Sequence, residues 1–260
     1  MKKIQILFIA VFVILMAFSS CKTVKPSDNE LNSDNIVPQP HSVQLSDETQ
    51  TSNSDFSGEP TLKVTDSVAY IFPNLEGNEL YAACEFVNDS NCPCYVKSVE
   101  YTLNISGKDK TISAEQPANT NCAIYPGESF YNAAWTAYDC LESDTVSVTD
   151  VTVKCEKSNA INTEIKISEL YMVQNYPSFA TVSGMMEQNS STVTLNEVYL
   201  GFYNSSNKLI GVWYFTDASE LAPGQKKHFT THLKSLQIEG LCNETAKITA
   251  KGFGLSRRES

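Results

Sequence analysis

From Thr61 onward the chain alternates between apolar and polar residues over short stretches separated by turn-forming residues. This pattern places every second side chain on one face of an extended strand, so it predicts half-buried strands. The apolar positions that show it best are Leu80, Ala82, Cys84 and Phe86, then Val99, Tyr101, Leu103 and Ile105, then Val151, Val153 and Cys155. No window of about fifteen residues shows a 3.6-residue period. The folded part is therefore expected to be all-β.

The chain after residue 60 contains two copies of one pattern. Five short segments of the first copy have counterparts in the second, in the same order and at offsets between 97 and 103 residues. The pairs are 62–66 with 165–169, 88–90 with 189–191, 97–101 with 196–200, 125–130 with 222–226, and Cys140 with Cys242. A near-constant offset indicates an internal repeat. We expect two tandem domains, residues 61–157 and 158–260, each of a size usual for an immunoglobulin-like antiparallel β-sandwich.

Part of the second copy resembles a known family. The run Leu200-Gly201-Phe202-Tyr203-Asn204, the turn and strand at 205–211 and the segment 221–224 resemble the FxLYD family, small β-sandwich modules of bacterial and archaeal envelope proteins. Leu200, Phe202 and Asn204 stand where the family motif has phenylalanine, leucine and aspartate. The resemblance implies a sandwich fold and an envelope setting, and it implies no catalytic residue.

Residues 1–20 have the parts of a secretory leader. Two lysines precede an apolar run over residues 4–18, and Ser19, Ser20 and Cys21 follow it. The run is shorter than the roughly 20 apolar residues that span a membrane, and its flanks are typical of a signal peptide. The segment 18–21 resembles the lipobox of bacterial lipoproteins, with Phe18 where leucine is usual. This resemblance implies that Cys21 carries acyl chains such as palmitate and anchors the mature chain. An ordinary signal peptide and an uncleaved anchor are the alternatives.

A polar spacer follows the lipobox. Residues 22–60 are rich in Ser, Asn, Asp, Gln, Thr and Pro, so they bury too little apolar surface to fold, and residues 21–60 are expected to form a flexible tether. The formal charge of −11 disfavours nucleic acid as a partner. We expect a protein of the cell envelope that is lipid-anchored to a membrane. In a diderm bacterium this would be the outer membrane or the cell surface, and Lys22, which stands where some inner-membrane lipoproteins have aspartate, does not argue against the outer membrane.

The folded part contains seven cysteines, namely Cys84, Cys92, Cys94, Cys122, Cys140, Cys155 and Cys242. In an exported domain the first interpretation is a set of disulfides, with one thiol left over because the number is odd. Cys84 and Cys155 fall on inward-facing positions, so a core bridge between them is expected, and Cys92 or Cys94 could pair with Cys122. The alternative is a soft-metal or redox site at Cys92 and Cys94, because thiolates one residue apart can both bind copper(I) or zinc.

Other chemistry is sparse in the sequence. His228 and His232 fall in a predicted strand over residues 226–233, roughly 13 Å apart, which is too far for one metal ion. The sequence contains no GxSxG elbow, phosphate-binding loop or dinucleotide-binding GxGxxG motif, and it implies no cofactor. Trp135, Trp213 and Tyr214 either pack between sheets or form an exposed aromatic patch that binds a sugar or a partner protein.

These observations predict a non-catalytic, membrane-anchored lipoprotein that serves as a binding, adhesion or accessory module of the envelope. Its partner would be an envelope protein or a polysaccharide. The alternative is a metal- or thiol-handling protein that uses Cys92 and Cys94. A third hypothesis is an envelope hydrolase whose acidic residues or histidines converge in a cleft.

Overall fold

The structure is a computed structural model that describes residues 58–74, 77–115, 122–141, 143–175, 179–234, 236, 238 and 240–255. The predicted leader, the predicted lipidation site Cys21 and the predicted tether up to residue 57 lie outside these residues. All pairings between the described strands are antiparallel. The all-β prediction is therefore confirmed.

The strands follow one another along the chain with one short helix near the end. They are β1 (Leu62–Asn74), β2 (Gly77–Asn88), β3 (Cys94–Ile105), β4 (Lys108–Glu115), β5 (Ser129–Tyr138), β6 (Val146–Lys157), β7 (Thr163–Asn175), β8 (Phe179–Gln188), β9 (Leu195–Tyr203), β10 (Leu209–Asp217), β11 (Gln225–His232) and β12 (Lys247–Leu255). The helix is α2 (Leu241–Glu244). No helix in the described ranges is both long and apolar enough to cross a membrane.

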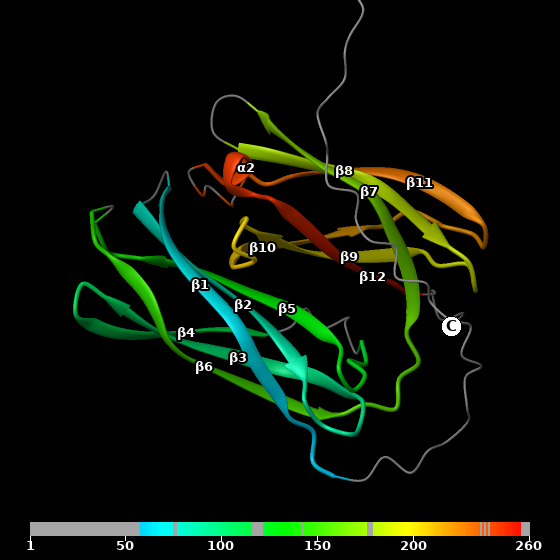
Figure 1. Cartoon of the computed structure of the whole chain (residues 1–260), viewed down its shortest axis with the longest axis horizontal. Helices are drawn as coiled ribbons and strands as arrows, with labels where there is room; N and C mark the ends of the chain where they lie inside the picture. The colour runs from blue at the N-terminus through cyan, green and yellow to red at the C-terminus, as the bar shows by residue number, and fades with distance from the viewer. Residues whose placement is uncertain are drawn as a thin grey trace, which may run out of the picture. The chain divides into compact units, whose positions relative to one another are not determined.

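The strand order repeats along the chain (Figure 1). The first six strands form two sheets, with the orders β1-β2-β5 and β4-β3-β6. The last six form one sheet of order β10-β9-β12-β7-β8-β11, whose two halves have the same order once β7 is matched to β1. These halves join only where Gly252–Gly254 pairs with Thr163–Ile165. The matching order agrees with an internal repeat, while the two-domain boundaries and the immunoglobulin-like type stay predictions.

The core of the first repeat uses the alternation seen in the sequence. The predicted inward residues of β2 and β3 are buried, and those of β6 are half-buried. Tyr101 joins the two sheets, because its hydroxyl donates to Asn132 Oδ1 at 2.9 Å and lies 3.3 Å from the Cys84 thiol. A buried hydroxyl needs such partners to offset the loss of water.

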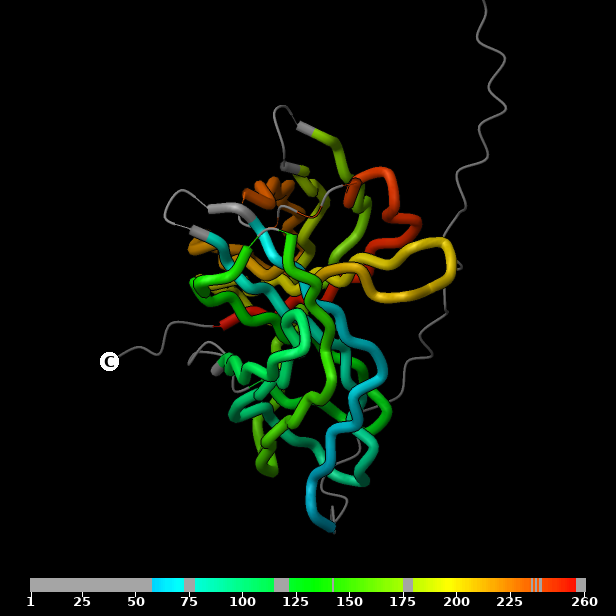
Figure 2. Tube along the Cα trace, turned by 90° about the vertical axis from the view of Figure 1, so that its left-hand side faces the viewer, coloured from blue at the N-terminus to red at the C-terminus, as the bar shows by residue number. Residues whose placement is uncertain are grey.

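The two repeats are packed against each other, and the described residues belong to one compact unit (Figure 2). Tyr81 of β2 reaches the edge of β10, where its hydroxyl donates to Val212 O at 2.9 Å and accepts from Val212 N at 2.7 Å. Asp66 of β1 accepts from Leu209 N at 2.9 Å. β10 is an edge strand of its sheet, and side chains of the other repeat thus satisfy its backbone groups at Leu209 and Val212.

Aromatic side chains fill the rest of this contact between the repeats. The rings of Phe130 and Tyr199 lie 4.7 Å apart, and the hydroxyl of Tyr203 donates to that of Tyr131 at 3.0 Å. Gly201 is required here, because a Cβ at this position would lie 2.7 Å from the Tyr131 ring. We call this contact the seam between the repeats.

Candidate functional site

Three of the predicted site cysteines, Cys92, Cys94 and Cys155, lie close together beside the segment that leads into β1. Cys94 begins β3 and Cys155 lies near the end of β6, on the neighbouring strand. The Cys94 thiol is hydrogen-bonded to the Cys155 thiol, and Cys92 is close enough to affect the pKa of both. All seven described cysteines are free thiols in the structure.

Burial favours the protonated form of the Cys94 and Cys155 thiols. It is the largest cause that raises the pKa of Cys94 to about 12, and the neighbouring Cys155 raises it further. Burial also raises the pKa of Cys155 above its usual range. Because the thiolate is both the nucleophile and the metal ligand, the raised pKa lowers the reactivity of Cys94 and Cys155, and the fully buried Cys94 is the less accessible of the two. No group of three or more His, Cys, Asp or Glu suited to a metal ion occurs among the described residues.

The predicted bridge between Cys84 and Cys155 is not formed. Cys84 contacts Tyr101, and Tyr101 pairs with Val151 on β6. Cys155 lies four residues further along β6, about 13 Å away at the rise of a β-strand. The two cysteines do sit on inward-facing positions, but at different heights along the strands, so alternation alone could not pair them.

Cys122 is buried and forms no disulfide with Cys92 or Cys94, although Ile124, two residues further along the chain, forms a β-bridge with Cys94. Burial, and to a lesser degree the charge of Glu197, raises the pKa of Cys122 to about 12. Glu197 on β9 is itself only 2% exposed, and its Oε1 has no hydrogen-bond partner among the described residues. Burial also raises the pKa of Glu197, while a hydrogen bond from Tyr199 lowers it.

The aromatic candidates belong to the seam. Trp213 donates its Nε1–H to Thr231 Oγ1 at 3.0 Å, and its ring meets that of Trp135 edge-on at 6.0 Å. Tyr214 also contacts Trp135, with ring centroids 6.1 Å apart, and it is 37% exposed. These contacts show that Trp213 and Tyr214 pack between sheets, and only Tyr214 presents a substantial surface to solvent.

A more exposed set of side chains lies on one face of the β7-β8-β11 sheet. Two cross-strand rows make up this outer face, and they run from Tyr171 through Ser183 to Thr230 and from Val173 through Thr181 to His232. Tyr171 is 52% exposed and Val173 is 48% exposed. The opposite face of the sheet is buried, with Val182, Met186 and Phe229 in the core.

Hydrogen bonds hold the polar members of the outer face in place. The hydroxyls of Ser183 and Thr230 lie 3.0 Å apart, and Thr181 Oγ1 lies 3.1 Å from His232 Nδ1. His228 and His232 both lie on β11, in the strand that the sequence predicted over residues 226–233, and both are exposed. The face therefore presents the Tyr171 ring, the Val173 side chain, the Thr230 hydroxyl and the His232 imidazole, whereas the hydroxyls of Ser183 and Thr181 on the central strand are buried at 5% and 8% exposure.

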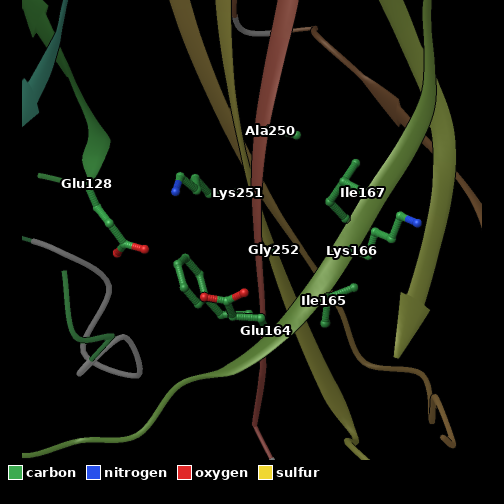
Figure 3. A pocket seen from close by; sticks show the side chains of 9 residues that line it. Glu128, Glu164, Ile165, Lys166, Ile167, Ala250, Lys251 and Gly252 are labelled. Carbon is green, nitrogen blue, oxygen red and sulfur yellow. The ribbon is translucent and has the colours of Figure 1, made fainter. Parts of the chain in front are cut away.

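A second, smaller feature is a cavity of about 180 Å³ where β7 and β12 diverge (Figure 3). Its charged lining residues are Glu128, Glu164, Lys166 and Lys251. Sites for drug-sized ligands usually measure about 300–1,000 Å³. The cavity is therefore suited to water or a small ion rather than to an organic substrate.

A β-bulge in β7 explains why the sequence did not predict the outer face. The register of β7 shifts between Ser168 and Tyr171, and Glu169 in the bulge has a positive φ of 53°. The extra residue reverses the alternation that begins at the buried Ile165. Without the bulge, Tyr171 and Val173 would point into the core. No local motif marks the shift, so alternation misplaces these two residues.

No protein-family model matches the chain, and no curated protein matches it significantly.

Proposed function

We propose that the chain is a non-catalytic, lipid-anchored envelope protein that binds a polysaccharide through its outer face. The observation that carries the proposal is the pair of exposed side chains, Tyr171 and Val173, on the same face as the exposed Thr230 hydroxyl and His232 imidazole, which contacts with Ser183 and Thr181 hold in place. A sugar ring has apolar C–H faces and polar hydroxyl edges. A protein surface that binds it therefore needs apolar side chains next to hydrogen-bonding groups. Tyrosine adds a rigid ring with a polar end, which suits a wet binding surface.

The charge of the outer face supports an uncharged or weakly charged partner. Lys226 and Glu187 flank the rows and lie 3.6 Å apart as an ion pair. The six residues of the two rows carry no carboxylate, although the chain as a whole has a formal charge of −11. An acidic surface would repel anionic envelope polymers, and this face adds no such repulsion.

The proposal of a lipid anchor rests on the sequence around Cys21 and on the length of the spacer at residues 22–60. Acylation of Cys21 would hold the fold at a membrane, and the spacer would let the outer face reach polymers away from the lipid. The resemblance to FxLYD modules of envelope proteins agrees with this setting.

Binding is tested with the full chain in detergent and polysaccharide purified from the envelope of the source bacterium. Replacing Tyr171 by Ser is expected to weaken retention about tenfold, since one lost aromatic contact of about 1.4 kcal/mol has this effect. Ile161→Ser is the matched control, because Ile161 is 78% exposed but lies in the linker before β7. The proposal would be contradicted if the polysaccharide retained the wild type and both variants equally. It would also be contradicted if the chain bound envelope proteins but not the polysaccharide.

Anchoring is tested separately by replacing Cys21 with Ser in the exported chain. The wild-type chain is expected in the membrane fraction with a fatty-acylated N-terminal peptide, and the variant without it. An unmodified Cys21 in the membrane-bound wild type would refute lipidation.

A thiol-handling role at Cys92 and Cys94 is the second candidate. It is favoured by one observation, the third thiol that Cys155 adds to this pair.

A further inference from the structure

The clustered thiols lie on one face of two paired strands. Cys94 pairs with Lys157 and Val96 pairs with Cys155, so the two cysteines are diagonal neighbours on the same side of the β3–β6 ladder. The register shifts between Val96 and Ser98, directly beside them. Such a bulge increases the local twist and can bring a diagonal pair closer than a regular ladder does.

The surrounding hydrogen bonds connect the thiols to the segment that leads into β1. The Cys155 thiol donates to Pro60 O at 3.4 Å, and the Cys92 thiol donates to Gly58 O at 3.8 Å. The sulfur of Cys155 also accepts a hydrogen bond from the Leu62 backbone. Residues 58–62 are where the predicted tether would join the folded part, so the cluster sits at the root of the tether.

We propose that Cys94 and Cys155 form a disulfide when the chain reaches an oxidising compartment, which links β3 to β6 at the tether root. Cys155 is the first thiol to react, because it is partly exposed whereas Cys94 is fully buried. This timing rests on the export assumed in the proposed function, but the choice of partners does not. Cys92 remains bound to the Gly58 carbonyl and keeps its thiol.

The reaction needs an external disulfide, either a small one such as oxidised glutathione or that of a thiol oxidoreductase. The Cys155 thiolate attacks one external sulfur and releases the other as a thiolate. The Cys94 thiolate then attacks Cys155 Sγ, so that the Cys94–Cys155 bond forms and the second external thiol leaves. Two protein thiols are oxidised, and one external disulfide is reduced to two thiols.

Two preparations of the full-length chain in detergent test the pairing. One is isolated from an exporting host with free thiols blocked at lysis, and the other is purified reduced and then treated with oxidised glutathione. Both are digested without reductant and analysed by mass spectrometry. The expected result in both is a linked pair of peptides that contain Cys94 and Cys155, with Cys84 and Cys92 blocked or free.

The outcomes separate the two proposals. A link in the glutathione-treated chain alone would uphold the pairing and count against export. Links from Cys155 to Cys84 or from Cys92 to Cys94, or glutathione left on Cys155 in the treated chain, would overturn the pairing. Cys92→Ser should retain the link and Cys155→Ser should abolish it. The wild-type peptides decide the matter if a variant fails to fold.

Discussion

At the scale of single residues, Glu197 conflicts most with its surroundings. Its carboxyl group is buried on β9, and one oxygen has no hydrogen-bond partner among the described residues. An unsatisfied buried polar group costs about 1–3 kcal/mol, and more when it is charged. Burial therefore raises the pKa of Glu197 above the ordinary value of 4.5.

This burial predicts a pH dependence of stability. Because the folded chain holds the Glu197 proton more tightly than the unfolded chain, the free energy of unfolding falls as pH rises above about 4.5 toward the raised pKa. Glu197→Gln should remove this loss and stabilise the chain by about 1 kcal/mol at pH 7. Urea unfolding of both chains at pH 4.5 and pH 7 checks it, with Glu59→Gln at an exposed position as the control. A variant that is equally destabilised at both pH values would contradict the argument.

At the scale of elements, alternation predicted the strands but not how the sheets meet. The predicted inward faces of β2 and β3 are buried as expected, and the predicted strand at 226–233 is β11. β9 shows what alternation leaves out, because every residue from Asn196 to Tyr203 is buried. One face of β9 packs inside its own repeat and the other forms the seam. The apolar run from Val198 to Tyr203 was the sequence signal for burial on both faces.

The edge of β10 gives a prediction at this scale. Tyr81→Phe removes the hydroxyl that satisfies both Val212 N–H and Val212 C=O, and it leaves these groups buried without partners. The expected loss is about 2–3 kcal/mol in the free energy of unfolding. Chemical unfolding in urea measures it. Tyr95→Phe removes a surface hydroxyl that contacts Glu156 and should cost less than about 1 kcal/mol. Equal losses in the free energy of unfolding in the two variants would contradict the claim that the Tyr81 hydrogen bonds at the seam stabilise the fold more than a surface hydrogen bond does.

At the scale of the whole molecule, the internal repeat was visible in the sequence but the seam was not. Matching offsets predicted two copies, and the strand orders agree. The contacts of Asp66 with Leu209 and of Tyr131 with Tyr203 join residues far apart in the chain. Such contacts carry no local signature. The thiol cluster was missed for the same reason, because Cys155 lies far from Cys94 in sequence.

The seam predicts that the two repeats unfold together. Trp135 belongs to the first repeat and Trp213 to the second, and both lie at the seam. Variants Trp135→Phe and Trp213→Phe each leave one fluorescent reporter. In each variant, fluorescence and circular dichroism should give one urea midpoint, because loss of either repeat exposes the aromatic face of the other. Separate midpoints for the two probes would contradict a single cooperative unit.

The central claim is that the outer face of the β7-β8-β11 sheet is the binding surface. Hydrogen–deuterium exchange of the full chain in detergent, with and without the envelope polysaccharide, tests this claim most directly. The account predicts slower exchange confined to peptides that cover Tyr171–Val173, Thr181–Ser183 and Thr230–His232. Protection that appears instead around Tyr214, or no protection at saturating polysaccharide, would contradict it.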